Sequence, residues 1–397
     1  MQLSSKQKQF IIDHEHENVS TLALQDSLFI DEDKLFLLTQ ISGRQIAKNK
    51  IPILYNNENI IYPVHLSLEQ SSSELTARFK ASLFPDKKEI FVDLTGGFGI
   101  DFMFLSTNFF NSVYVETDQR LCDIAEYNFH QLGLNNVSII HSNAESYIRE
   151  TNKVDLLFLD PSRRNSDGRK VFRIEDCSPN LAEIAEILVE KADKVLIKYS
   201  PMLDISLALK TLLNVVHVYV VSVENECKEL LFLMSKEKSE LEYHTVNLKK
   251  NGDNETFLFS PEDEQNCKIE FTSQLGNYLY EPNASILKAG GFTIIADRYG
   301  VKKLHRNSHL YTSEEMISSF PGRKFKIENV ISPNKRHLQT ILAETKKANI
   351  AVRNFPMSVE EIRKKTRLKE GGDIYLFATT LVDEKKVWII CRKADKN

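Results

Sequence analysis

The sequence has little of what marks several protein classes. Its 397 residues include five cysteines, all far apart and none in a CxxC pair. That spacing argues against a disulfide framework and a zinc ribbon, so we expect reduced thiols and no metal. No run approaches the roughly 18 apolar residues of a membrane span, and the first ten residues lack the basic-then-apolar order of a secretory signal. We therefore expect a cytoplasmic protein with no membrane partner.

The net charge is also small, at −4, but the charges are unevenly distributed. Residues 276–397 carry 23 Lys and Arg against 13 Asp and Glu, whereas residues 1–275 carry 28 against 42. A basic end on an acidic body indicates a partner that is a polyanion. The alternative is that the lysines only increase solubility, and charge alone does not decide between the two.

Hydrophobic spacing divides the chain into parts. Residues 1–66 show helical spacing, and a further helix is predicted at Leu68–Leu83. Within residues 67–240, short apolar runs alternate with helix-length segments, which predicts βαβ units and a doubly wound α/β domain with a parallel sheet. The seven predicted strands are Ile90–Leu94, Val113–Glu116, Val137–His141, Val154–Asp160, Lys194–Lys198, Val215–Val221 and Leu230–Met234.

The remaining chain predicts an extension and a C-terminal α+β module. Residues 241–275 resemble antiparallel strands joined by a turn at residues 251–253, and we treat them as a β extension or linker. The module follows as segments 276–321 and 322–397. It is expected to contain basic helices at Lys335–Lys347 and Val359–Lys369 and a final strand hairpin, Asp373–Thr380 with Lys386–Arg392.

The strongest local pattern is a glycine turn after the first predicted strand. Asp93 ends that strand, Gly97 and Gly99 follow, and a helix is expected to begin near residue 100. Glycines there let the backbone approach a ligand, and Glu116 at the tip of the next strand can accept both hydroxyls of a ribose. The sequence therefore predicts a site for a cofactor that contains a nucleoside.

The same residues discriminate between cofactors. The third glycine of the dinucleotide pattern is replaced by Phe102, and Asp93 would repel a pyrophosphate. This disfavours an NAD-dependent oxidoreductase. An acid at this place suits the amino group and sulfonium of S-adenosylmethionine.

Three further loops follow predicted strands. Asn143, followed by Ala144, is a candidate for binding adenine, although a plain helix cap is the alternative. The fourth strand ends in Asp160 and Pro161, and the next residues include Arg163, which suits phosphate. After the fifth strand come Lys198 and Ser200. We predict that Asp160, Pro161, Arg163, Lys198 and Ser200 line the acceptor side of the site.

These motifs together resemble the class I S-adenosylmethionine-dependent methyltransferases. The resemblance rests on the glycine-turn pattern of Asp93, Thr95, Gly97, Gly99 and Asp101 and on the Asp160–Arg164 loop. From about residue 65 onward the chain resembles a bacterial group in which a Rossmann-like, seven-stranded methyltransferase domain precedes a ferredoxin-like segment and a THUMP-like domain. The resemblance implies that cofactor binding involves Asp93, Thr95, Gly97, Gly99, Asp101, Glu116, Asn143, Ala144 and Asp160.

THUMP domains are associated with RNA modification, so the resemblance implies a tRNA or rRNA substrate, held through the basic C-terminal module. The expected function is thus methylation of a nucleotide in structured RNA. Two alternatives stay open: an RNA-binding protein whose methyltransferase fold is catalytically silent, and a methyltransferase for small molecules. Related enzymes that methylate amino groups carry proline and an aromatic residue where this chain has Ser162 and Arg163. Stacking on a base at that place is therefore not expected.

Overall fold

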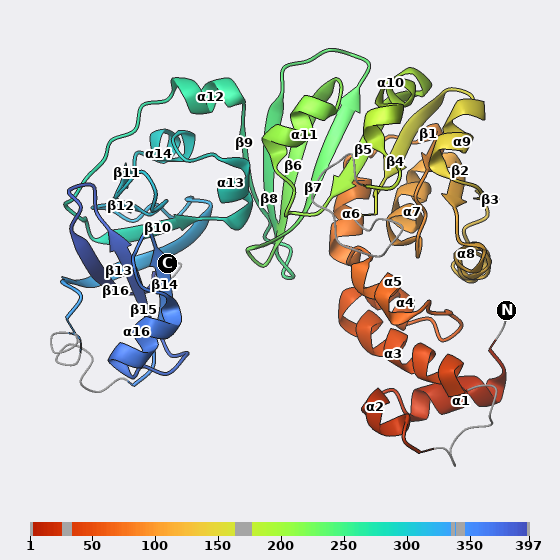
Figure 1. Ribbon diagram of the computed structural model, residues 1–397, viewed down its shortest axis with the longest axis horizontal. Coiled ribbons are helices and arrows are strands. Elements are labelled where there is room, and N and C mark those ends of the chain that lie inside the picture. The colour runs from red at the N-terminus through yellow and green to blue at the C-terminus, as the bar shows by residue number, and fades with distance from the viewer. Residues whose placement is uncertain (1–2, 26–33, 163–176, 335–337, 339–345, 395–397) are drawn as a thin grey trace. The chain divides into compact units, whose positions relative to one another are not determined.

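The computed structural model describes residues 3–25, 34–162, 177–334, 338 and 346–394 (Figure 1). The chain divides into two compact units, and each has its own core. The first comprises Met1–Val218 with Glu229–Ser239, and the second comprises Tyr219–Lys228 with Glu240–Asn397. Among the described residues, no helix is both long enough and apolar enough to cross a bilayer.

The first unit begins with short helices, as the helical spacing predicted. Ser4 and Gln7 form a capping box at the first of them, which satisfies two N–H groups that a helix start leaves unpaired. Gln40 exchanges two hydrogen bonds with the backbone of Tyr62, and this ties the longest helix to the chain that follows it. The helices are α1 (Ser5–Asp13), α2 (Val19–Leu22), α3 (Lys34–Lys50) and α4 (Pro52–Tyr55).

The predicted helix Leu68–Leu83 is wrong as a single element. The structure has two helices there, α5 (His65–Gln70) and α6 (Glu74–Ser82). Three serines separate them, and the Ser73 side chain accepts a hydrogen bond from the backbone N–H of Thr76, so it caps a new helix. Serine competes with the helical backbone for hydrogen bonds, which explains the break.

The sheet of the first unit has the predicted seven strands, in the order β3-β2-β1-β4-β5-β7-β6. The pairs from β3 through β5 are parallel, and β7 is antiparallel to β5. The α/β prediction is therefore confirmed. The strands are β1 (Lys88–Asp93), β2 (Phe109–Glu116), β3 (Val137–His141), β4 (Val154–Leu159), β5 (Ala192–Tyr199), β6 (Val215–Val223) and β7 (Glu226–Ser235).

Helices connect the parallel strands and bury aromatic side chains against them. Phe102 stacks on both Phe91 and Phe129, with ring centres 5.4 and 5.0 Å apart, and Tyr114 meets Phe102 edge-on. Because these rings come from two strands and two helices, they fix how the helices lie on the sheet. The helices are α7 (Ile100–Leu105), the 3-10 helix η2 (Ser106–Asn108), α8 (Gln119–Gln131), α9 (Ala144–Glu150), α10 (Leu181–Lys191) and α11 (Ile205–Thr211).

The second unit includes two strands, β8 (Glu242–Leu248) and β9 (Glu255–Phe259), which pair antiparallel as predicted. The turn between them contains Gly252 at φ 85°, a conformation that glycine adopts without strain.

The second unit contains a seven-stranded sheet in the order β11-β12-β10-β13-β16-β15-β14. All its neighbouring strands are antiparallel except β14 and β15. Leu376 and Ile390 belong to one core cluster and Phe377 and Ile389 to another, so both faces are buried by alternating residues. The strands are β10 (Tyr278–Pro282), β11 (Lys302–Lys303), β12 (Tyr311–Ser313), β13 (Gly322–Ile331), β14 (Asn349–Arg353), β15 (Ile374–Thr380) and β16 (Lys386–Lys393).

Among the described residues of this unit, the helices are α12 (Pro261–Asn266), α13 (Ala284–Ala289), α14 (Ile294–Tyr299) and α16 (Val359–Thr366). The predicted helix Val359–Lys369 ends early, because Arg367 adopts a left-handed backbone with φ 64°. The predicted helix Lys335–Lys347 lies largely outside the described residues. The predicted C-terminal hairpin is confirmed as β15 with β16.

Candidate active site

The strand order reverses between β1 and β4, and this places two predicted loops side by side. Asp93 at the end of β1 pairs in register with Phe158 of β4, two residues before Asp160. In addition, the backbone N–H of Asp160 donates to the Thr95 hydroxyl at 2.6 Å. Open α/β sheets bind ligands at the carboxyl ends of strands at such a reversal. The first unit therefore has its candidate site at this edge.

Two features of the glycine turn require glycine. Gly99 has φ 80° and begins α7, and a Cβ there would lie 2.7 Å from the Phe129 ring. Gly96 packs so closely on Tyr114 that a Cβ would lie 2.2 Å from its ring. Gly97, at φ 57°, has room for a Cβ, whose nearest neighbour would be the Thr95 carbonyl oxygen at 3.7 Å. Gly97 is half-buried and its carbonyl accepts the Tyr114 hydroxyl, while Gly96 and Gly99 hold the turn against the aromatic core.

Glu116 closes the turn from the next strand. One of its carboxylate oxygens accepts the Gly97 N–H at 2.7 Å, and the other accepts the N–H groups of Thr117 and Asp118 at 2.7 and 2.9 Å. A carboxylate has about four acceptor positions, so the oxygen facing Gly97 keeps capacity for a ligand hydroxyl. The two residues predicted to flank a nucleoside are therefore in direct contact.

Asp93 is a buried acid with no basic partner among the described residues. Its side chain is 1% exposed, and it accepts the Thr95 N–H at 2.9 Å and the Thr95 hydroxyl at 3.4 Å. Burial raises the pKa of the Asp93 carboxyl, against the effect of that backbone hydrogen bond. A buried carboxylate without a counter-charge fits a ligand that brings a positive group.

Asn143 caps a helix in the structure. Its side-chain oxygen accepts the Ser146 N–H at 2.7 Å, and Ala144 follows as the first, buried residue of α9. The oxygen is thus engaged, and the amide nitrogen is the part of Asn143 suited to hydrogen-bond a base. Adenine binding by Asn143 and Ala144 stays a prediction.

The structure brings Lys198, Asp101 and Asp160 together. The Lys198 Nζ lies 2.5 Å from an Asp160 oxygen and 3.1 Å from an Asp101 oxygen, and it donates to the Ser72 hydroxyl at 3.0 Å. Burial works against the charged lysine, but the two carboxylates raise its pKa. Lys198 therefore stays protonated and is no general base. Burial raises the pKa of Asp160 despite the contact with Lys198.

Two members of this network, Lys80 and Glu229, were not singled out in the sequence. Lys80 is fully buried on α6, and its Nζ lies 2.6 and 2.8 Å from the Glu229 oxygens on β7 and 3.1 Å from Asp101. Burial opposes ionisation of Asp101, yet Lys198 and Lys80 lower its pKa to about 2. Asp101 Oδ2 thus accepts hydrogen bonds from Lys198 and Ser72, and its Oδ1 lies beside the Lys80 ammonium.

The described contacts of Pro161 and Ser200 do not assign either residue a role at the site. Pro161 is buried after β4. The Ser200 hydroxyl accepts the Met202 N–H at 3.2 Å and so supports the turn after β5. Arg163 lies outside the described residues. Roles for Pro161, Arg163 and Ser200 at the acceptor side remain predictions.

Comparison with known proteins identifies the family. A family model described as a ferredoxin-like domain matches residues 278–321, and one described as a THUMP-like domain matches residues 322–393. The crystal structure named "putative methyltransferase from Porphyromonas gingivalis W83" is 32% identical, covers 100% of both chains and has a TM-score of 0.88. The chain belongs to this methyltransferase family.

More distant similarities cover part of the methyltransferase. A Streptococcus mutans protein solved with S-adenosylhomocysteine is 17% identical over 41% of this chain and 96% of its own, with a TM-score of 0.33. M. capricolum TrmK, also solved with that product, is 14% identical over 41% of this chain and 68% of its own, with a TM-score of 0.32. No curated protein sequence matches the chain.

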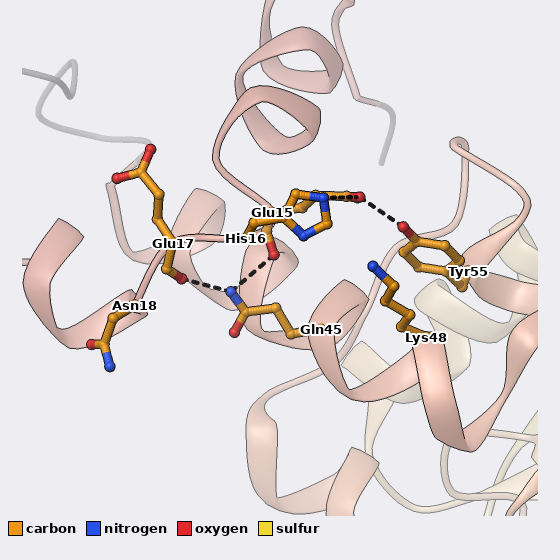
Figure 2. A pocket seen from close by; sticks show the side chains of 7 residues that line it. All are labelled: Glu15, His16, Glu17, Asn18, Gln45, Lys48 and Tyr55. Atoms are coloured by element: carbon orange, nitrogen blue, oxygen red, sulfur yellow. Dashed lines mark hydrogen bonds and ion pairs between the residues drawn. The ribbon is translucent and has the colours of Figure 1, made fainter.

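A polar cavity of about 400 Å³ lies in the N-terminal helices of the methyltransferase (Figure 2). There Glu15 accepts hydrogen bonds from Arg44 Nε and the Tyr55 hydroxyl at 2.9 and 2.7 Å, and Gln45 donates to backbone carbonyls of Glu15 and Glu17. Burial opposes ionisation of Glu15, but these two donors lower its pKa. The contacts fasten the chain between α1 and α2 to α3, and we assign them a structural role.

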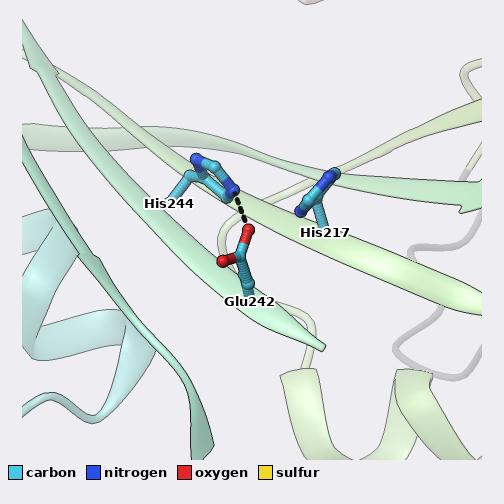
Figure 3. Close-up of side chains that lie close together, drawn as sticks. All are labelled: His217, Glu242 and His244. Atoms are coloured by element: carbon cyan, nitrogen blue, oxygen red, sulfur yellow. Dashed lines mark ion pairs between the residues drawn. The ribbon is translucent and has the colours of Figure 1, made fainter. Parts of the chain in front are cut away.

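A second group of titratable side chains lies on β8. Glu242 and His244 face the same side of the strand, with the His244 Nε2 3.4 Å from a Glu242 oxygen, and Figure 3 shows this pair. The His244 ring also lies 4.7 Å from that of Tyr219. Neither group contains residues of the predicted site.

Proposed function

We propose that this methyltransferase uses S-adenosylmethionine to methylate a nucleotide in structured RNA. The main observation in favour of this cofactor is the hydrogen bond from the Gly97 N–H to the Glu116 carboxylate at 2.7 Å, together with the buried acid Asp93. An acid for the ribose, a tight glycine turn and an uncompensated carboxylate are the three features that suit an adenosyl amino acid.

The residues present fit the cofactor as follows. Glu116 would accept the ribose hydroxyls, Gly97 and Gly99 would approach the methionine end, and Asp93 would receive its ammonium group. Asn143 would donate to adenine. Thr95 fixes Asp93 through its N–H and hydroxyl, so the acid is oriented before the cofactor arrives. The cofactor supplies a methyl group on a sulfonium.

Asp160 and Lys198 are proposed to act on the acceptor. The lysine is held by two carboxylates, so it orients Asp160 rather than removing a proton. One Asp160 oxygen then remains to accept a hydrogen bond from an amino group of a base. In-line methyl transfer depends mainly on alignment of the acceptor with the sulfonium, and such positioning is what this pair provides.

The RNA substrate is supported by the second unit. Its THUMP-like match spans residues 322–393, and that region carries exposed basic side chains. Lys346, Lys347, Lys364 and Lys365 are exposed, and Arg363 is half-buried beside them in sequence. Lysine and arginine contacts to phosphates make binding strongly salt-dependent.

Calorimetric titration with S-adenosylmethionine and S-adenosylhomocysteine tests the cofactor. Wild type should bind both. Glu116→Gln should weaken binding about tenfold or more, because hydrogen bonds to a charged group contribute about 1.5–3 kcal/mol. Glu126→Gln on the exposed side of α8 is the matched control and should bind as wild type does. Absence of wild-type binding at millimolar ligand would refute the cofactor proposal, and unchanged affinity in Glu116→Gln would remove Glu116 from the ribose role.

Mass spectrometry of tRNA and rRNA nucleosides from cells with and without the gene tests the substrate. One methylated nucleoside should disappear in the deletion. Neutralising the five basic residues above should weaken RNA binding while cofactor affinity stays unchanged. RNA binding without any missing methyl group would favour a silent fold, and salt-independent substrate binding would favour a small-molecule substrate.

A further inference from the structure

Lys303, in the second unit, is a buried lysine without an acidic partner. It ends β11 and is 4% exposed. Its Nζ lies 5.2 Å from the centre of the Phe292 ring and 5.8 Å from that of Tyr311. Among the described residues, no carboxylate lies within ion-pairing distance of it. Its neighbour Lys302 is the opposite case, since it is exposed and lies 2.6 Å from a Glu270 oxygen.

Glu264 is the acid whose charge acts on Lys303, but its carboxylate already accepts hydrogen bonds from the backbone. Glu264 raises the pKa of Lys303, but its two oxygens accept the backbone N–H groups of Thr293 and Ile294, each at 2.8 Å. Burial is the stronger effect and lowers the pKa of Lys303 to about 8. At neutral pH the side chain is therefore still mostly charged. A buried charge without a partner is costly, so its presence calls for a ligand or a structural reason.

His309 adds a second unsatisfied group beside Lys303. Its ring stacks on Phe292 with centres 3.8 Å apart, and its Nδ1 is buried with no hydrogen-bond partner among the described residues. Burial, Lys303 and Arg353 lower the pKa of His309 to about 4. Its backbone has φ 49°, a left-handed conformation that costs a residue other than glycine about 1–2 kcal/mol.

The loop that carries His309 also reaches β14. The His305 Nδ1 lies 2.9 Å from the Asn354 amide nitrogen, directly after Arg353. The Arg353 side chain is 38% exposed and also contacts the buried Glu281, whose second oxygen pairs with Arg323. The ion pair with Glu281 thus holds the Arg353 side chain in place, while part of that side chain stays exposed to solvent. Lys303, His309 and Arg353 come from β11, the following loop and β14. Lys303 and His309 lie against the same Phe292 ring, and the charges of Lys303 and Arg353 both act on the His309 ring.

We propose that Lys303, His309 and Arg353 form a binding site for a phosphate group of RNA. A phosphate oxygen would accept charge-assisted hydrogen bonds from the Lys303 ammonium and from those Arg353 N–H groups that the bonds to Glu281 and to the Val352 carbonyl leave over. The Phe292 ring, which both Lys303 and His309 contact, would form one wall of the site. The inference rests on the proposed RNA substrate, and it adds a phosphate contact to those expected from the exposed lysines of the THUMP-like region.

Lys303→Met tests the site, with Lys302→Met as a control of equal charge on the same strand. RNA extracted from bacterial cells, separated into tRNA and rRNA, is the probe in filter binding. Lys303→Met should weaken binding about tenfold or more and reduce the slope of log affinity against log salt by about 0.7–0.9. Lys302→Met should change affinity less than threefold. Cofactor titration should give wild-type values for both variants.

Thermal unfolding separates this role from a structural one. Because methionine removes an uncompensated buried charge, the melting temperature of Lys303→Met should equal or exceed that of wild type. A lower melting temperature with unchanged RNA affinity would overturn the site and leave the proposed function intact. Wild type that binds neither RNA fraction but binds the cofactor would overturn both the site and the RNA substrate. Stabilisation by inorganic phosphate that depends on Lys303, without any effect of Lys303 on RNA affinity, would assign the site to free phosphate instead.

Discussion

The buried pair of Lys80 and Glu229 gives a sharp test of what holds the candidate site together. The Lys80 Nζ contacts both Glu229 oxygens, at 2.6 and 2.8 Å, and the two side chains are 0% and 6% exposed. Lys80→Met keeps the length of the side chain and removes its charge. Asp101 Oδ2 retains Lys198 and Ser72 as partners. The variant therefore leaves the two Glu229 oxygens and Asp101 Oδ1 without their lysine.

The expected loss is large because Glu229 cannot reach water. Removing one partner of a buried pair costs about 3–5 kcal/mol, whereas replacing both by apolar residues of similar volume is often neutral. For a unit of this size, about 2–4 °C per kcal/mol translates this into a decrease in melting temperature of roughly 6–20 °C. The double variant Lys80→Met with Glu229→Met should recover most of that loss. Lys153→Met, at an exposed pair with Asp193, should cost about 1 kcal/mol or less.

The assay is thermal and urea unfolding of the full chain, followed by a signal from the first unit. The coupling free energy is the double-variant loss minus the two single losses, and it should be about 3 kcal/mol in magnitude. Two results would refute the reasoning: a Lys80→Met loss no larger than that of Lys153→Met, or a double variant as unstable as the single one. The first would mean that Glu229 has a partner other than Lys80, and the second that the loss arises at Asp101 rather than at Glu229.

Two further predictions concern the glycine turn and Asp101. Gly99→Ala should lower the free energy of unfolding by about 2–4 kcal/mol, since it adds a clash with the Phe129 ring to a strained backbone at φ 80°. Gly133→Ala, at φ 73° with open space, is the control and should lower it by about 1 kcal/mol. Equal losses in urea unfolding would contradict this. The pKa of Asp101 is lowered from 3.8 to about 2, so its ionisation stabilises the fold above pH 4 and that contribution, about 2 kcal/mol, is lost as the pH falls to 2. Denaturant unfolding between pH 6 and 3 should therefore show wild type losing more stability than Asp101→Asn, and parallel curves would contradict the assignment.

The parts of the fold that the sequence predicted well are those with a local cause. The seven strands of the first sheet are apolar runs bounded by polar residues, so their positions follow from hydrophobic spacing. The glycine turn was recognisable because a left-handed backbone, with φ 80° at Gly99, favours glycine and so leaves a local sign in the sequence. The helix predicted through Ser71–Ser73 was wrong because a serine cap competes with helix continuation, and hydrophobic spacing does not register that competition.

The parts of the site that escaped prediction depend on residues far apart in the sequence. Lys80 and Glu229 are 149 positions apart, and each alone resembles a charged residue on the surface of a helix or strand. A lysine is seldom buried without an acid beside it, so only the assembled fold reveals the pair. Lys303 illustrates the converse, because nothing in its sequence neighbourhood distinguishes it from the exposed Lys302.

The contacts among Lys198, Asp101 and Asp160 also connect the predicted cofactor side of the site with the predicted acceptor side. Sequence reasoning placed Asp101 with the cofactor and Lys198 with the acceptor, yet Lys198 contacts both Asp101 and Asp160. A substitution at Asp101 therefore alters the charge that orients Asp160, whether or not Asp101 touches a cofactor. Asp93 makes no ion pair with that network among the described residues, and its hydrogen-bond donors are the N–H and hydroxyl of Thr95. The Thr95 hydroxyl also accepts the Asp160 N–H, and the charges of Asp101 and Asp160 raise the pKa of Asp93. A cofactor effect at Asp93 or at Asp101 must therefore be compared with the same measurement on a Lys198 variant before it can be assigned to either side.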